Sequence, residues 1–292
     1  MKIHKMDLEY NINRNGKILV WIYSQTSPLG LHDLSEEEKK GSKILMTEEA
    51  TGCKRDIDLK QIRKFFENEK EGNFDAQIEV KQQIRAPFEE FKSELKKLDT
   101  EKPVEYQCFV FVFLTYSKPQ YKGEYSEEFL HFDHKKMAEG LVPQAKIIDE
   151  VKNLNVTKGK PKIFLIQADD LSLLKDKMTQ KVVGFETPKV IKIPTDADQL
   201  IIKSTIPQRI ANKHAATETP SFLIQAFLKA MKNKKEKEDL LTLTTTINRH
   251  VADLITKSKD KRAADMHVPL VTSTLTKLLF LQANTTPEHV IS

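Results

Sequence analysis

Residues 159–169 read GKPKIFLIQAD, an apolar run that follows Gly, Lys and Pro and ends at Asp169. Similar runs occur at 18–23 (ILVWIY), 108–114 (CFVFVFL) and 199–204 (QLIIKS). Each run is short, rich in β-branched or aromatic residues and bounded by polar or turn-forming residues, which predicts strands buried on both faces. A fifth run at 268–275 (VPLVTSTL) has a proline near its start, as an edge strand can.

Segments with a helical spacing of apolar residues lie between these runs. In 58–68, Leu59, Ile62 and Phe66 share one face, and we expect Asp58 to cap the helix. Similar patterns predict helices over 86–98, 143–154, 221–231 and 240–255. The alternation predicts an α/β fold with a mostly parallel central sheet and helices on both faces. Long polar stretches at 24–43, 116–125, 171–189 and 208–220 are predicted loops, and four of them beside one sheet indicate a site built from loops.

Composition excludes several classes of protein. The longest apolar stretch, 108–114, is far shorter than the roughly 20 residues of a membrane helix, and the first ten residues carry charges where a secretion signal needs an apolar core. The only two cysteines, Cys53 and Cys108, are too few for a disulfide scaffold, which favours the cytoplasm. The net charge is only +5 and acidic residues interrupt the lysine clusters, so we expect neither nucleic-acid nor membrane partners.

The stretch 159–169 resembles the active-site segment of the caspases, in which Lys-Pro-Lys and an apolar strand lead to Gln-Ala-Cys-Arg-Gly. Residues 56–68 resemble the first caspase helix, and 108–114 resemble the strand that ends at the catalytic His. Further along, 193–207 is similar to the start of the small subunit, and 247–252 and 273–277 look like its second helix and dimer-interface strand. On these ordered matches the chain is identified as a member of the caspase family, which implies a caspase-like fold with large- and small-subunit regions.

The resemblance also implies a division of the chain. We expect a short tail at 1–9, a large-subunit-like region at 10–170, a linker loop at 171–189, a small-subunit-like region at 190–282 and a tail at 283–292. This is the layout of the short-prodomain caspases. The linker contains Asp176 in the sequence LLKD, a candidate processing site that the upstream Leu and the following Lys make mediocre.

Both catalytic positions have changed. Caspases cleave after Asp with a Cys nucleophile and a His, whereas the resemblance places Asp169 at the Cys position and Tyr116 at the His position. A carboxylate is a poor nucleophile toward an amide, and a phenol with a pKa near 10 is a weak base at neutral pH. Losing one member of a comparable Ser–His pair lowers kcat by about 10⁶. We therefore expect an inactive homologue that needs no cofactor or metal.

The pocket that would hold a substrate Asp is also altered. Gln167 is retained, but Gly52 (or Glu48, with a two-residue shift) replaces the first arginine of the family, and Lys213 replaces the second. Like-charge contacts with Asp169 and Asp170 would each cost an incoming carboxylate about 4 kcal/mol at 4 Å and a dielectric near 20. We expect one of these two carboxylates to neutralise Lys213.

Other reactive residues have plainer interpretations. Cys108 starts a buried strand and is expected in the core, as are Trp21 and the alternating Phe109, Phe111 and Phe113. Cys53 lies in a polar loop with no local His motif. His131 and His134 flank Asp133 but lack further ligands, so we interpret them as surface residues rather than a metal site.

The resemblance implies dimerisation through an edge strand made of Val268, Pro269, Leu270, Val271, Thr272, Ser273, Thr274 and Leu275. The leading hypothesis is a pseudo-caspase that regulates an active caspase by forming a heterodimer, with activation and inhibition both open. One alternative is a decoy or scaffold homodimer that binds caspase adaptors or inhibitors. The other is a cysteine endopeptidase with redirected activity and a new nucleophile such as Cys53.

Overall fold

The structure is a computed structural model. It describes residues 8–13, 15–25, 55–68, 72, 74, 76–100, 105–122, 125–134, 139–170, 197–208, 210, 219–234 and 238–281. Within these residues, no helix is long and apolar enough to cross a membrane.

The described strands form one sheet of eight strands. Its main path has the order β2-β1-β3-β6-β7-β8, made of β2 (Gln77–Ile84), β1 (Lys17–Ser24), β3 (Tyr106–Lys122), β6 (Lys162–Asp170), β7 (Gln199–Ser204) and β8 (Leu270–Ser273). The first five are mutually parallel, and β8 pairs antiparallel with β7. Two further strands, β4 (Tyr125–His131) and β5 (Leu141–Pro143), extend antiparallel from the end of β3.

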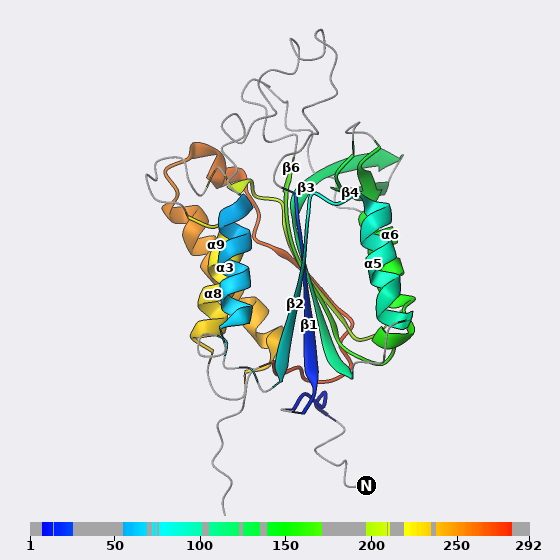
Figure 1. Cartoon of the computed structure of the whole chain (residues 1–292). Helices are drawn as coiled ribbons and strands as arrows, with labels where there is room; N and C mark the ends of the chain where they lie inside the picture. Colours follow the sequence, from blue (N-terminus) through cyan, green and yellow to red (C-terminus); the bar gives the residue numbers. More distant parts are fainter. Residues whose placement is uncertain are drawn as a thin grey trace, which may run out of the picture.

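Helices cover both faces of the sheet. Figure 1 shows α3 (Arg55–Glu67), α8 (Phe222–Lys232) and α9 (Leu240–Lys257) on one side, and α5 (Phe88–Thr100) and α6 (Gln144–Lys152) on the other. Two short 3-10 turns, Asn155–Thr157 and Lys261–Asp265, follow α6 and α9. The predicted α/β architecture is confirmed, and each of the five predicted helices is present with ends shifted by a few residues.

The two faces carry separate cores because side chains alternate along each strand. On β3, Cys108, Val110 and Val112 contact the core under α3, α8 and α9, whereas the alternate phenylalanines contact the core under α5 and α6. Phe111 stacks on Phe164 of β6 with ring centroids 5.5 Å apart. Burying each such ring contributes about 1.5–3 kcal/mol, so β3 is central to both cores.

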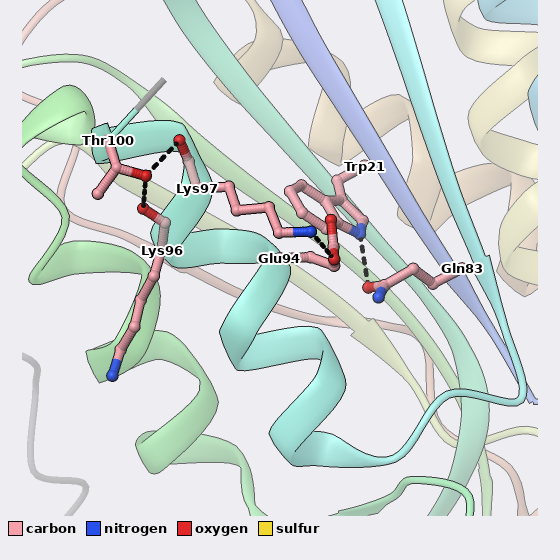
Figure 2. A network of polar contacts seen from close by, with 6 residues as sticks. All are labelled: Trp21, Gln83, Glu94, Lys96, Lys97 and Thr100. Carbon is pink, nitrogen blue, oxygen red and sulfur yellow. Dashed lines mark hydrogen bonds and ion pairs between the residues drawn. The ribbon is translucent and has the colours of Figure 1, made fainter.

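Trp21 of β1 is buried beneath α5, as predicted. Its ring meets Phe91 of that helix edge-on at 5.8 Å. Figure 2 shows its Nε1 donating to Oε1 of Gln83 on the neighbouring edge strand at 3.1 Å, together with the Lys97–Glu94 contact on α5. The indole therefore has both its apolar body buried and its one donor satisfied, and its hydrogen bond joins β1 to β2.

Two local predictions are wrong, and the strand β2 was missed. The stretch 116–125 is not a loop, because β3 continues to Lys122 and pairs antiparallel with β4, which supplies the backbone partners that a loop would lack. The strand β2 was not predicted, since its sequence QIEVKQQI is mostly polar on a half-exposed edge. Asp58 does not cap α3 but lies in its first turn, where its carboxylate accepts the backbone N–H of Ser221 at 2.6 Å and ties α3 to α8.

Candidate active-site region

Parallel pairing of β3 and β6 brings Tyr116 and Asp169 next to each other. The two residues are direct partners in the ladder, one step beyond the pair Thr115 and Ala168. Paired residues of neighbouring strands point to the same face, here the face covered by α3, α8 and α9. Both residues are fully buried. The positions predicted for the family's nucleophile and base are therefore adjacent in space.

The Asp169 carboxylate is held by neutral donors on both oxygens. Its Oδ1 accepts a hydrogen bond from Nε2 of Gln167 at 2.8 Å, and its Oδ2 accepts one from the backbone N–H of Gln208 at 3.0 Å. Hydrogen bonds from N–H donors to a carboxylate are stronger than neutral ones. The carboxylate is thus a structural acceptor that links β6 to the segment after β7.

Gln167, to which the resemblance assigns a place in the substrate pocket, has both of its donor hydrogens engaged. A side-chain amide has two N–H hydrogens, and Nε2 of Gln167 bonds to Asp169 and, at 2.8 Å, to the carbonyl oxygen of Ile206. Gln167 is also fully buried. In this arrangement its amide has no hydrogen left to donate to a substrate carboxylate.

The opposite face of β3 fixes the strand beside this site. Thr115 Oγ1 donates to the carbonyl of His131 on β4 at 2.5 Å, and Ser117 Oγ donates to the carbonyl of Ala168 on β6 at 3.0 Å. Tyr116 lies between these two residues, within a strand rather than in the predicted loop. Its backbone is therefore held on both sides by hydrogen-bonded neighbours.

Several predicted site residues lie outside the described residues. These are Gly52 and Glu48, Lys213, Cys53 and the candidate processing site Asp176. The proposed neutralisation of Lys213 by Asp169 or Asp170 stays a prediction.

Cys108 lies in the core, as predicted. Burial raises the pKa of its thiol far above the usual range, and it lies eight positions before Tyr116 on β3. A protonated thiol is not a nucleophile, so Cys108 is not suited to act as a catalytic cysteine.

The prediction of surface histidines is wrong for His131. Its side chain is fully buried in β4, where burial lowers the pKa of the imidazole to about 4. The ring is therefore neutral at physiological pH. His134 is partly exposed and lies 3.3 Å from a carboxylate oxygen of Glu139.

Sequence reasoning missed a buried ion pair beside the site. Lys203 of β7 has a side chain only 7% exposed, and its Nζ lies 3.0 Å from Oε2 of Glu128 on β4. Burial lowers the pKa of Lys203, while the carboxylates of Glu128 and Asp170 act in the opposite direction. The available signal was a lysine inside the otherwise apolar run QLIIKS. The Asp170 carboxylate thus acts electrostatically on a lysine that the sequence did not suggest.

The predicted interface strand is shorter than expected. The strand β8 contains only Leu270–Ser273, and Thr274 continues the pairing by donating its N–H to the carbonyl of Gln199 at 2.8 Å. Leu270 is 59% exposed and Val268 is 43% exposed, both unusually high for large apolar side chains. In the described part of the chain, β7 is the only strand paired with β8. Among the described strands, its other side is therefore an edge.

Comparison with known proteins identifies the family. Residues 46–280, well over half of the chain, match the family described as the caspase domain. The chain belongs to the caspase family. It is 31% identical to Caspase-1 of Drosophila melanogaster over 129 residues, which cover 41% of this chain and 39% of that protein. It is 32% identical to Caspase-3 of Bos taurus over 131 residues, which cover 42% of this chain and 44% of that protein. The match thus spans less than half the length of either relative.

Solved caspase structures share the fold along almost the whole chain. The structure of pro-sf-caspase-1 aligns with a TM-score of 0.61 at 19% identity, covering 95% of this chain and 99% of that one. The crystal structure of Caspase-1 from Spodoptera frugiperda aligns with a TM-score of 0.59 at 20% identity, covering 98% of each chain. The predicted caspase-like fold is confirmed. Caspase homologues are cysteine endopeptidases, and this chain has a carboxylate at the position predicted for the cysteine.

Proposed function

We propose that this caspase homologue has no peptidase activity and regulates an active caspase by pairing with it through β8. One observation carries the first part. Asp169, at the position that the resemblance assigns to the nucleophile, is fully buried and accepts hydrogen bonds on both carboxylate oxygens. A group held in this way acts as part of the core.

Three features of the site argue against peptidase activity. The nucleophile position holds a carboxylate, the base position holds the buried phenol of Tyr116, and both donor hydrogens of Gln167 are engaged within the protein. Loss of one member of a nucleophile–base pair lowers kcat by about 10⁶ in a comparable serine enzyme, and here both members are replaced. Cleavage after Asp is therefore not expected at a measurable rate.

The edge of the sheet supports the second part of the proposal. An exposed edge strand offers unpaired backbone groups to another strand, and natural proteins usually protect such edges with charges or a covering segment. At this edge Leu270 is largely exposed instead. In a two-fold pairing β8 would lie beside the corresponding strand of a partner, extending the sheet across both subunits. The partner we propose is a cytoplasmic caspase of the active class.

The test is co-expression with an active short-prodomain caspase. Native mass spectrometry measures the heterodimer, and hydrolysis of an Asp-containing peptide measures the activity of the pair against the caspase alone. We expect a heterodimer and a changed turnover; an increase identifies an activator and a decrease an inhibitor. Absence of a heterodimer together with unchanged turnover contradicts the proposal.

A matched pair of variants distinguishes association through β8 from nonspecific association. Leu270→Lys places a charge on the exposed edge of β8, and Leu241→Lys places the same charge on α9, where the side chain is 41% exposed. We expect Leu270→Lys to weaken heterodimer formation by about 100-fold, as for a central interface residue, and Leu241→Lys to leave it unchanged. Equal loss in both variants would argue against pairing through β8.

The same exposed edge also favours a second candidate, a homodimer that binds caspase adaptors or inhibitors as a decoy. The discriminating result is a stable homodimer that persists when the active caspase is present and leaves its turnover unchanged. In that case Leu270→Lys would convert the homodimer to monomer.

A further inference from the structure

The segment before β1 lies along the segment that follows β8. Glu9 forms a parallel bridge with Leu278. The backbone N–H of Tyr10 donates to the carbonyl of Leu278 at 3.0 Å, and the N–H of Leu278 donates to the carbonyl of Leu8 at 2.8 Å. Residues from opposite ends of the described chain are thus hydrogen-bonded side by side.

The side chain of Tyr10 extends this contact to the start of β7. Its hydroxyl donates to Oδ1 of Asp198 at 2.5 Å, and Thr276 Oγ1 donates to the same oxygen at 2.6 Å. The N–H of Thr276 donates to the Tyr10 hydroxyl at 3.1 Å. Burial and the Asp198 carboxylate raise the pKa of Tyr10, so its hydroxyl remains a donor. We call Tyr10, Asp198 and Thr276 the clasp.

Asp198 joins the clasp to the last pairs of the β7–β8 ladder. It has a left-handed backbone with φ of 67°, a conformation that Asp and Asn tolerate better than most residues. Its N–H donates to the carbonyl of Thr274 at 2.8 Å, and its own carbonyl accepts from Lys162 on β6 at 2.9 Å. The clasp therefore fixes the chain directly after β8 to the amino ends of β6 and β7.

We propose that the clasp holds the edge strand β8 in the position needed for pairing, so that Tyr10 controls an interface to which it does not itself belong. The inference rests on the proposed function. The strand β8 has only four residues and, in the described chain, a single partner strand. So short a strand is marginal without added contacts, and hydrogen bonds to a carboxylate are the stronger kind. In this arrangement Tyr10 is a positioning residue for the edge.

Hydrogen exchange of the isolated full chain tests the clasp without any partner. Tyr10→Phe keeps the ring and removes the hydroxyl. We expect the amides of 270–274 to exchange about tenfold faster, because the variant removes both the hydrogen bond to Asp198 and the one from the N–H of Thr276. Thr256→Val is the matched control, because its hydroxyl donates only to Ala252 within α9. Exchange at 270–274 that is the same in both variants would overturn the clasp.

Asp198→Asn is the conservative variant, because Asn also adopts the left-handed backbone and keeps an acceptor oxygen but loses the charge. We expect exchange between that of the wild type and that of Tyr10→Phe. A larger effect than that of Tyr10→Phe would mean that the Asp198 carboxylate acts mainly through Thr276, which donates to the same oxygen, and would contradict a clasp centred on Tyr10.

The pairing measurement then separates this inference from the proposed function. We expect Tyr10→Phe to raise the dissociation constant of the heterodimer about tenfold, in proportion to the loss of the ordered edge. A wild-type chain that forms no heterodimer contradicts the proposed function. A wild-type chain that pairs, with Tyr10→Phe pairing equally well, contradicts the clasp alone.

Discussion

The carboxyl end of β6 and the outer edge of β8 belong to one sheet but are built in opposite ways. At the end of β6, Asp169 is fully buried and bonded on both carboxylate oxygens. At β8, Leu270 is mostly exposed and one side of the strand is unpaired in the described chain. The first region has polar residues used for stability, and the second has apolar residues that do little for the folded monomer. Substitutions should therefore affect the stability of the first region and the pairing of the second.

The largest effect on folding is expected for Asp169→Ala. Removing the carboxylate leaves two buried donors, the Gln167 amide and the Gln208 backbone N–H, without their acceptor. Each unsatisfied buried donor costs roughly 1–3 kcal/mol, so we expect the free energy of unfolding to fall by about 4 kcal/mol in urea denaturation.

The control for this variant is Asp149→Ala on α6. That carboxylate is exposed and pairs with Lys152 at 3.0 Å, a contact worth less than about 1 kcal/mol. A loss below about 1 kcal/mol for Asp169→Ala as well would mean that Asp169 is not a structural residue, and the contrast between the two regions would fail.

A smaller loss in the free energy of unfolding, about 3 kcal/mol, is expected when the pH is lowered. The folded-state pKa of His131 is about 4, whereas an unfolded chain has about 6.5. Between these values the unfolded state binds more protons, so stability present above pH 6.5 is lost as the pH falls toward 4. The full difference corresponds to roughly 3 kcal/mol by the value of one pKa unit. Urea denaturation at several pH values measures it.

The variant His131→Phe isolates this contribution from that of the carboxylates. We expect its stability to depend less on pH than that of the wild type between pH 6.5 and 4. His267→Asn, at an exposed position, serves as the control and should follow the wild type. Parallel pH curves for wild type and His131→Phe would show that a group other than His131 causes the loss of stability in acid.

Lys203 lies on β7 between the two regions, where it is the ladder partner of Ile166 on β6 and of Leu270 on β8, and its side chain pairs with Glu128 on β4. Glu128→Gln leaves a nearly buried lysine with a weaker partner, and we expect a loss of about 2 kcal/mol, below the range for a fully buried pair because Glu128 is partly exposed. Lys203→Met replaces the charge by an apolar chain of similar length, and we expect a change within about 1 kcal/mol. Thermal unfolding of both variants measures the difference. A larger loss for Lys203→Met than for Glu128→Gln would refute the interpretation that Glu128 stabilises the protein by neutralising a buried lysine.

Much of the fold was predictable because the central strands have a strong signal. The strands β1, β3, β6 and β7 are buried on both faces, and each appears in the sequence as a short, continuous apolar run. The edge strand β2 has no such run, since one side faces solvent and its residues are mostly polar. The continuation of β3 beyond Tyr116 was equally hidden, because its partner β4 is polar and its pairing depends on the fold.

The roles of the site residues stay a prediction, and their contacts could not be predicted from the sequence. The caspase resemblance assigns roles to Tyr116, Asp169 and Gln167, and the parallel pairing of β3 and β6 places Tyr116 beside Asp169. Asp169 accepts a hydrogen bond from the backbone N–H of Gln208, and this contact depends on the path of the chain after β7, which no residue type specifies. The same reason hides the contact of Lys203 with Glu128, whose positions are far apart in the sequence.

The smallest effect is expected for a variant that restores both catalytic residue types, because we expect it to gain little peptidase activity. The double variant Asp169→Cys with Tyr116→His places a thiol and an imidazole on adjacent positions of β6 and β3. The resemblance still predicts Gly52 and Lys213 where two arginines would bind the substrate carboxylate, and one lysine does not replace a pair of bidentate guanidinium groups. We expect turnover of an Asp-containing peptide to stay at least about 10⁴-fold below that of an active caspase measured in parallel. Turnover near that of the active enzyme would contradict the prediction that the altered pocket prevents cleavage in addition to the two catalytic positions.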